Sequence, residues 1–291
     1  MILAKPTIQP LRTFFSGNIP VDVLKLHEIH PIVSGNKWYK LRYYLEAALE
    51  GGYNALITRG GPYSNHLVAT AFAAKAAGLT SYGIVRGHQP AQLSITLQDA
   101  VSYGMQLHFT GYNKSSDDAL FLDAIPNSLL IPEGGMGITG IRGAATILSE
   151  NNFSNYTHII AAAGTGTMVA GLTVAAMPHQ KVIGISVLKN APAPINEIAH
   201  WLETMGEARM PEILHFPYGG YAKLNKAVLQ TMHTCWEQEN LPLDFVYTGK
   251  LFTAVTELLH QNYFPKNSSL LVIHSGGLQG NRSLPPNSLP F

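Results

Sequence analysis

The feature that most constrains the fold of this chain is an alternation of short apolar runs with longer stretches at helical spacing. In residues 38–50, apolar side chains recur at i, i+3, i+7, i+10 and i+11, which places them on one face of a helix. A second long helix is expected over residues 224–239. Strands alternating with helices in this way are typical of a mainly parallel α/β protein. The expected strands cover residues 22–26, 55–58, 81–85, 106–109, 128–131, 157–162, 182–187 and 270–274.

Composition argues against several classes of protein. The 291 residues carry a net charge of +1 with only 13% charged residues and no cluster of Lys or Arg, whereas a nucleic-acid partner requires a basic face. The single cysteine, Cys235, excludes an internal disulfide and a cysteine-based zinc site, and the 12 histidines show no metal-ligand spacing. The chain has no run of about 18 apolar residues and no N-terminal signal pattern. We therefore expect a cytoplasmic protein without a membrane span, a metal ion or a nucleic-acid partner.

Glycine is concentrated in segments that directly follow predicted strands. Three of them, TRGGPYSNH (58–66), AGTGTM (163–168) and HSGGLQGN (274–281), hold part of the 27 glycines. In AGTGTM, the amides of the turn and of the following helix N-terminus are suited to bind a small phosphate ester. The segment lacks the third glycine and the ribose-binding acid of a dinucleotide site, and no lysine follows as in a P-loop. A plain tight turn remains the alternative.

Lys37 lies in the first turn of the expected helix, within SGNKWYKL, and Ser34 or Asn36 is its candidate N-cap. Because a cation there meets the positive end of the helix dipole, the neutral amine is favoured. A neutral lysine near a phosphate-bearing aldehyde is what Schiff-base chemistry requires. The alternative is a solvated lysine beside a helix cap, and Lys40 is open to the same two interpretations.

Further polar and aromatic groups lie at strand ends. Ser64, Asn65 and His66 begin the helix after residues 55–58 and offer donors to a carboxylate, although Ser64 is equally expected as an N-cap. Ser275 follows the last strand and faces the crevice where α/β sheets bind ligands. Tyrosines beside glycines can approach a flat ligand or lie in a core; these are Tyr218, Tyr221 and Tyr247.

Seven segments together resemble one family. They are GNKWYKL, GGPYSNH, EGGM, AGTGTM, YGGYAK, VYTGK and HSGG, in this order. The set is similar to the D-cysteine desulfhydrase and 1-aminocyclopropane-1-carboxylate deaminase family, pyridoxal-phosphate enzymes of the tryptophan-synthase-β-like group, over residues 12–280. The resemblance implies fold type II, with two doubly wound open-sheet α/β domains and the cofactor between them. Residues 1–51 and 153–291 are expected to form the larger, cofactor-binding domain, residues 52–152 the smaller inserted domain, and two chains a homodimer.

The resemblance also implies how the cofactor, pyridoxal 5'-phosphate, is held. Lys37 matches the lysine that binds the cofactor covalently and later moves the Cα proton of the substrate. Asn65 matches the residue that hydrogen-bonds the ring hydroxyl, and Ser275 is the candidate partner of the pyridine nitrogen. The expected phosphate cradle consists of Gly164, Thr165, Gly166 and Thr167.

The remaining matches concern the substrate, a small amino acid. Ser64, Asn65 and His66 belong to the loop expected to bind its carboxylate, with Ser64 also a candidate catalytic residue. Tyr247 matches a catalytic tyrosine near the cofactor ring. Tyr218 or Tyr221 is the candidate for a second active-site tyrosine, and the alignment leaves the choice between them open.

One departure from the family favours one activity. Relatives of the deaminase branch carry a glutamate that pairs with the pyridine nitrogen where this chain has Thr248. A neutral hydroxyl from Ser275 leaves that nitrogen largely unprotonated, which favours β-elimination. We therefore expect D-cysteine to be converted to pyruvate, ammonia and sulfide. The alternatives are deamination of 1-aminocyclopropane-1-carboxylate to 2-oxobutanoate and a catalytically silent protein that binds the cofactor or an amino acid.

Overall fold

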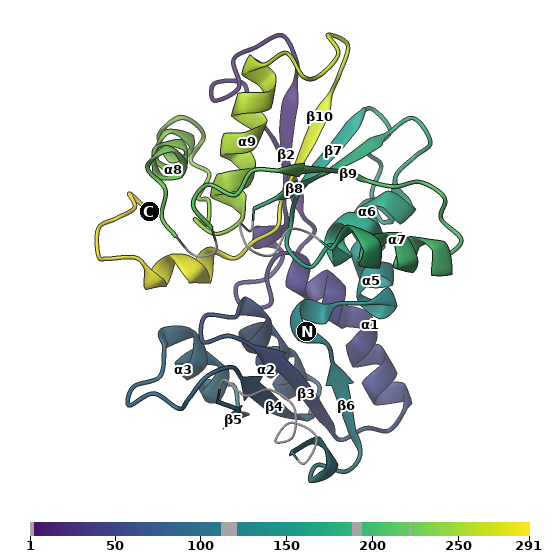
Figure 1. Cartoon of the computed structure of the whole chain (residues 1–291), viewed down its shortest axis with the longest axis vertical. Helices are drawn as coiled ribbons and strands as arrows, with labels where there is room; N and C mark the ends of the chain where they lie inside the picture. The colour runs from purple at the N-terminus through teal and green to yellow at the C-terminus, as the bar shows by residue number, and fades with distance from the viewer. Residues whose placement is uncertain (1–2, 112–120, 188–193, 221–222) are drawn as a thin grey trace.

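The computed structural model describes residues 3–111, 121–187, 194–220 and 223–291, and its strands form two separate sheets (Figure 1). The larger sheet is parallel except for the antiparallel pair β1–β2. Its order is β1 (Thr7–Pro10), β2 (Val21–Lys25), β10 (Leu270–His274), β7 (His158–Ala163), β8 (Lys181–Ser186) and β9 (Glu212–His215). The smaller sheet is parallel throughout. Its order is β5 (Met105–Phe109), β4 (Thr80–Val85), β3 (Ala55–Gly60) and β6 (Ser128–Ile131).

Helices follow most of these strands, as the sequence pattern predicts. The described helices are α1 (Asn36–Glu50), α2 (Asn65–Ala76), α3 (Ile95–Ser102), α5 (Ile138–Ser149), α6 (Thr167–Ala175), α7 (Ile195–Thr204), α8 (Lys226–Glu239) and α9 (Thr248–His260). Short 3-10 turns are η1 (Leu26–Glu28), η2 (Glu133–Gly135) and η3 (Leu278–Ser283). Within the described residues, no helix has the length and apolar character needed to cross a membrane.

All eight strands expected from the sequence are present, and none of their ends differs by more than two residues. Two strands were not expected, β1 and β9, both of four residues and both at an edge of the larger sheet. An edge strand has only one hydrogen-bonded neighbour and little buried side-chain area, so its apolar signal is weak. In β1, Pro10 further weakens the strand pattern, because proline is tolerated only at sheet edges.

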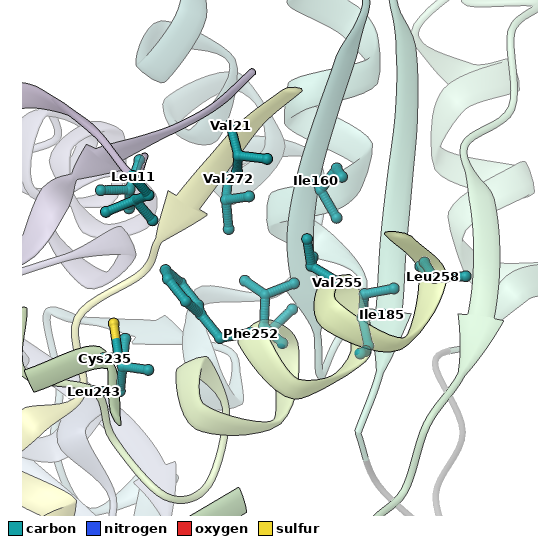
Figure 2. Close-up of a cluster of buried hydrophobic side chains, with 14 of the residues drawn as sticks. Leu11, Val21, Ile160, Ile185, Cys235, Leu243, Phe252, Val255, Leu258 and Val272 are labelled. Atoms are coloured by element: carbon teal, nitrogen blue, oxygen red, sulfur yellow. The ribbon is translucent and has the colours of Figure 1, made fainter. Parts of the chain in front are cut away.

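Helices cover both faces of the larger sheet, because alternate side chains of its strands point to opposite faces. In β7, Ile160 belongs to the core under α8 and α9, whereas Ile159 belongs to the core under α5 and α6. Figure 2 shows the first of these cores, where Phe252 and Val255 of α9 lie near Val272 of β10. Each such fully buried side chain contributes about 1.5–3 kcal/mol of transfer free energy.

Helix α1 lies between the two sheets (Figure 1). Tyr39 packs in the core of the larger sheet, whereas Leu41 and Tyr44 pack in a core with strands β3 and β6 of the smaller sheet. The contact with α5 is close: a Cβ on Gly143 would lie 1.8 Å from the carbonyl oxygen of Tyr39, so only glycine fits. Helix α5 itself falls within residues 52–152, but Ile147 packs on the larger sheet. The first two turns of α1 are therefore fixed from both sides.

Candidate active site

A cavity of about 1040 Å³ opens between the two sheets. Its walls come from turns at the carboxyl ends of strands in both sheets, which is where open parallel sheets bind ligands. The turns follow β3, β6, β7 and β10, and α1 adds two lysines. Its lining includes Lys37, Lys40, Ser64, Asn65, His66, Glu133, Gly164, Thr165, Gly166, Asp244, Tyr247, Ser275, Gly276 and Gly277.

The start of α1 is fixed against the end of β10. The N-cap position is Gly35, rather than Ser34 or Asn36, and its φ of +66° is a conformation that favours glycine. The Asn36 N–H donates to the carbonyl oxygen of Ser275 at 3.0 Å. A Cβ on Gly35 would lie 2.0 Å from the same oxygen. The position of Lys37, the next helical residue, therefore depends on this backbone contact.

The amines of Lys37 and Lys40 both face the cavity. Burial lowers the pKa of Lys37 to about 8, while the negative charge of Asp244 acts in the opposite direction. Burial and the nearby Lys37 hold the pKa of Lys40 well below its ordinary value. Lys37 Nζ donates to Asn36 Oδ1 at 3.2 Å, and Lys40 Nζ donates to Thr165 Oγ1 at 3.4 Å. The two lysines thus serve different parts of one cavity; Lys40 is buried and Lys37 is half-buried.

The segment 164–167 forms a turn between β7 and α6. Gly166 has a φ of +77°, and α6 begins at Thr167, so the first N–H groups of the helix have no carbonyl partner inside it. The hydroxyls of Thr165 and Thr167 lie 3.1 Å apart. Gly164, Thr165 and Gly166 line the cavity, whereas the Thr167 side chain is fully buried. This part of the cavity is suited to an anion, because the helix dipole and the nearby Lys40 both favour negative charge.

The turn after β3 places Ser64 at the N-cap position of α2, but its hydroxyl makes no capping hydrogen bond. Asn65 Nδ2 donates to the carbonyl oxygen of Gly277 at 3.4 Å. Asn65 Oδ1 is buried and has no hydrogen-bond partner among the described residues. Buried amide oxygens are normally paired, so this atom is available to a ligand that donates a hydrogen bond.

His66 is oriented by the smaller sheet. Thr58 Oγ1 donates to the carbonyl oxygen of Ile131 at 2.9 Å and lies 3.0 Å from His66 Nε2. Because the threonine proton is already used, Nε2 is the ring nitrogen that carries hydrogen. Burial, Lys37 and Lys40 hold the pKa of His66 well below its ordinary value, so the ring is neutral. Its Nδ1 is buried without a hydrogen-bond partner in the part of the chain that the structure describes.

Tyr247 and Asp244 come from the segment before α9. A Cβ on Gly164 would lie 3.4 Å from Tyr247 Cε1, so this ring stands beside the turn that follows β7. The Asp244 carboxylate accepts from the N–H of Tyr247 at 2.8 Å and from the hydroxyl of Thr248 at 2.6 Å. The sequence analysis did not identify Asp244, although an aspartate shortly before a helix is a capping signal.

Ser275 and Thr248 differ in what they face. Ser275 lines the cavity at the end of β10, as expected. Thr248 is fully buried and is bound to Asp244 on both sides: its hydroxyl donates to the carboxylate and accepts from the Asp244 N–H at 2.7 Å. The hydroxyl at position 248 therefore stabilises the start of α9.

Tyr218 does not line the cavity. Its hydroxyl donates to Glu257 Oε1 of α9 at 2.8 Å, and this contact and burial raise its pKa. The backbone of Gly219 and Gly220 lines the cavity instead. The second tyrosine named from the sequence, Tyr221, lies outside the described residues. The position of Tyr218 depends on its pairing with α9, which a local sequence pattern does not reveal.

Comparisons with known proteins agree with this geometry. A family model described as "Pyridoxal-phosphate dependent enzyme" matches residues 13–276. A protein of Pyrococcus horikoshii named "Putative 1-aminocyclopropane-1-carboxylate deaminase" is 28% identical over 278 residues, 85% of this chain and 81% of that protein. A protein of Pyrococcus furiosus with the same name is 26% identical over 85% of this chain and 82% of its own length.

Solved structures give the same fold. The crystal structure of an ACC deaminase homologue matches with a TM-score of 0.82 and 26% identity, covering 96% of this chain and 91% of that one. A pyridoxal 5'-phosphate-dependent aspartate racemase matches with a TM-score of 0.74 over 99% of this chain and 93% of its own, a likeness of fold alone at 15% identity. These structures confirm the α/β class with open, mainly parallel sheets that the sequence predicts.

Proposed function

This chain belongs to the family of pyridoxal-phosphate dependent enzymes, and we propose that it is a lyase that eliminates sulfide from D-cysteine to give pyruvate and ammonia. One observation carries the proposal. The Lys37 amine, the anion-binding turn at Gly164–Gly166 and the donor-rich turn at Ser64–His66 line the same cavity. Lyase chemistry on an amino acid needs these three groups together: a base, a cofactor phosphate site and a carboxylate site.

The residues present fit the cofactor. Its phosphate carries negative charge, which suits the start of α6 and the Lys40 amine next to Thr165. Its ring hydroxyl can donate to Asn65 Oδ1, the buried oxygen that has no partner among the described residues. Tyr247 stands beside Gly164 at the edge of this space, and Ser275 offers a neutral hydroxyl to the pyridine nitrogen. When bound, pyridoxal phosphate supplies the conjugated system that spreads the negative charge developing at the substrate Cα.

Lys37 is the proposed base. A lysine whose pKa lies near 8 holds a usable fraction of neutral amine at neutral pH, whereas an ordinary lysine does not. We propose that Lys37 Nζ binds the cofactor covalently and, once released by the substrate, removes the Cα proton. A neutral His66 next to the two lysines adds no further positive charge to this space.

The substrate carboxylate is proposed to bind at the start of α2. Ser64 lines the cavity and its hydroxyl makes no capping hydrogen bond, and the first backbone N–H groups of the helix have no carbonyl partner inside it. The His66 ring is engaged with Thr58, so we propose that His66 contributes its backbone rather than its side chain to this site. Loss of sulfide from Cβ and addition of water then account for the products: D-cysteine and water give pyruvate, ammonia and hydrogen sulfide.

A second candidate function is deamination of 1-aminocyclopropane-1-carboxylate to 2-oxobutanoate. It is favoured by the names of the Pyrococcus relatives and of the ACC deaminase homologue. D-cysteine is preferred here because position 248 carries a threonine bound to Asp244, which leaves the neutral Ser275 as the candidate partner of the pyridine nitrogen. We also propose that residues 52–152 form the smaller domain and that two chains form a homodimer. Light scattering on a sizing column measures the number of chains.

The test uses wild-type protein and the Lys37→Ala variant, each loaded with pyridoxal phosphate. We expect wild type to show the visible absorption of covalently bound cofactor and to release pyruvate from D-cysteine. Lys37→Ala should lose both, because the base and the covalent link are one amine. Lys75→Ala, which removes an exposed lysine of α2, serves as the matched control and should retain both.

Product analysis separates the alternatives. Pyruvate from D-cysteine supports the desulfhydrase, and 2-oxobutanoate from the cyclopropane amino acid supports the deaminase. A normal cofactor spectrum without turnover of either substrate would sink both activities and leave a catalytically silent binding protein. A Lys37→Ala spectrum identical to that of wild type would overturn the assignment of the lysine.

A further inference from the structure

We propose that Asp244, in the segment before α9, provides the buried counter-charge of the Lys37 amine. Asp244 thereby determines the charge of Lys37 before the cofactor binds. The consequence for catalysis rests on the proposed function, in which Lys37 is the base. The placement of the two charges does not. Asp244 was not among the residues singled out from the sequence, and nothing in the family comparison assigns it a role.

The carboxylate of Asp244 is buried and surrounded by hydrogen-bond donors. Its side chain is 1% exposed. One oxygen accepts from the N–H groups of Val246 at 3.0 Å and Tyr247 at 2.8 Å, and the other accepts from the N–H of Thr248 at 2.8 Å and from its hydroxyl at 2.6 Å. Both oxygens accept and neither donates, which is the pattern of an ionised carboxylate. The start of α9 thus stabilises a negative charge that water barely reaches.

The same carboxylate stands at the cavity, across one short turn from Lys37. The turn after β10 is packed on one side against Gly35, whose Cβ would lie 2.8 Å from Cα of Gly276. On its other side, a Cβ on Gly277 would lie 3.4 Å from Cγ of Asp244. Lys37 lies two residues after Gly35 in the sequence, and both Lys37 and Asp244 line the cavity. The turn after β10 therefore contacts both the start of α1 and the Asp244 carboxylate.

No other described carboxylate of the cavity can play this part. Glu133 also lines the cavity, but its Oε2 is paired with the Arg86 guanidinium at 2.8 Å and both side chains are about half exposed, at 45% and 50%. The other charged side chains of the cavity lining are cationic: Lys37, Lys40, Arg86 and Lys223. Asp244 is thus the one buried anion that the described cavity lining offers to the lysines.

Other titratable groups around the pair do not replace this role. Lys40 of α1 acts on Lys37 in the same sense as burial, and His66 of α2 is neutral. Near Asp244, burial lowers the pKa of His274 on β10, and the Lys250 amine of α9 donates to backbone carbonyls at 3.2 Å. Burial alone would lower the pKa of Lys37 further than the value of about 8 at which it stands, because Asp244 opposes it. Removing this charge should therefore make Lys37 neutral at a lower pH.

The test measures Lys37 directly in the full chain freed of cofactor. Formaldehyde with cyanoborohydride methylates neutral amines, and peptide mass spectrometry reports the methylation of Lys37 as a function of pH. Wild type should show a midpoint near pH 8 for Lys37 and a much higher one for the exposed Lys75 in the same sample. In Asp244→Asn we expect the Lys37 midpoint to fall by about one pH unit, which raises its labelling rate at pH 7 about fivefold. Asparagine is also a good helix cap, so it removes the charge while it retains most of the capping contacts.

Two controls separate charge from stability. Thr248→Val removes the hydroxyl that donates to the Asp244 carboxylate and accepts from the Asp244 N–H, and it keeps the charge, so the Lys37 midpoint should fall by less than in Asp244→Asn. Asn225→Ala removes the side chain that caps α8, where it accepts from the N–H of Ala227 at 2.8 Å, and should leave the midpoint unchanged. If Asp244→Asn does not fold, Asp244→Ser, a second neutral capping residue, takes its place.

Three results would overturn the proposal. They are an unchanged Lys37 midpoint in a folded neutral variant, a shift of equal size in Asn225→Ala, and a wild-type Lys37 midpoint that equals that of Lys75. Because the measurement uses neither cofactor nor substrate, it is independent of the proposed function. A shifted midpoint in a protein that turns over no amino acid would contradict the proposed lyase and leave the Asp244 proposal standing.

Discussion

Two lysines one turn apart on α1 face the same cavity with different neighbours. Lys37 donates a hydrogen bond to Asn36, and the charge of Asp244 raises its pKa, whereas Lys40 donates to Thr165 of the anion-binding turn. Helix position and charge leave both lysines open to the same interpretation, and only the family resemblance singles out Lys37 in the sequence. The structure separates them through the tertiary contact between α1 and the turn after β7. Lys40 is thus the residue through which the phosphate of the cofactor should be recognised.

We expect Lys40→Met to weaken the binding of pyridoxal phosphate about 10- to 100-fold, because a hydrogen bond to a charged group such as the phosphate contributes about 1.5–3 kcal/mol. Binding of pyridoxal, which has no phosphate, should be nearly unchanged. Absorption or fluorescence titration with the two ligands measures the difference. Lys75→Met is the control, since it removes an exposed amine far from Thr165. An equal loss for both ligands would show that Lys40 acts on the fold and not on the phosphate.

At the scale of elements, the start of α1 matters more than its length. Gly35 and Gly52 flank this helix and have the same φ of +66°. A Cβ on Gly35 would meet the carbonyl oxygen of Ser275 at 2.0 Å, whereas a Cβ on Gly52 would meet nothing within 4 Å. The two glycines thus share a positive φ, but Gly35 also has a ψ of −154°, which is essentially restricted to glycine, and it contacts the turn after β10.

This pair gives a matched test. Gly52→Ala should cost about 1 kcal/mol of unfolding free energy, the strain of a left-handed residue. Gly35→Ala should cost about 3 kcal/mol or more, because the clash with backbone adds to a conformation that is essentially restricted to glycine. Urea denaturation of both variants measures this difference. In addition, Gly35→Ala should bind pyridoxal phosphate poorly, since Lys37 is displaced with the helix start. Equal effects of the two substitutions on stability and on cofactor binding would refute this explanation.

The elements themselves could largely be predicted from the sequence, and so could the turns that hold the site. Buried central strands produce strong apolar runs and were found, as were the edge strands β5 and β6 of the smaller sheet, while the edge strands β1 and β9 of the larger sheet were not. Ser64, Gly164 and Ser275 were identified because each lies in a glycine-bearing segment that follows a predicted strand. The environment of Asp244 and the pairing of Tyr218 with Glu257 depend on how α9 packs, and no local pattern encodes that packing.

At the scale of the whole molecule, the two sheets are joined by helices that pack closely on one another. Helix α1 packs on both, and the small residues of α5 and α6 allow the close approach that brings Lys40 to Thr165. A Cβ on Gly171 of α6, for example, would lie 2.6 Å from Cβ of Ala144 of α5. The cavity walls are therefore shared: Ser64 and Asn65 follow the smaller sheet, while Gly164 and Ser275 follow the larger.

A ligand that contacts both sheets should stabilise the whole chain, because binding to the folded state alone shifts the unfolding equilibrium. At a free pyridoxal phosphate concentration of about 100 times its Kd, we expect about 2.7 kcal/mol of added stability and a rise in Tm of about 5 °C or more. Thermal unfolding followed by circular dichroism measures the rise. Pyridoxal at the same concentration should give a smaller one, since it cannot engage the start of α6 and Lys40, and Lys37→Ala should reduce the effect of the phosphate ester. Unfolding that splits into two transitions, of which pyridoxal phosphate shifts only one, would mean that the cofactor contacts one sheet only.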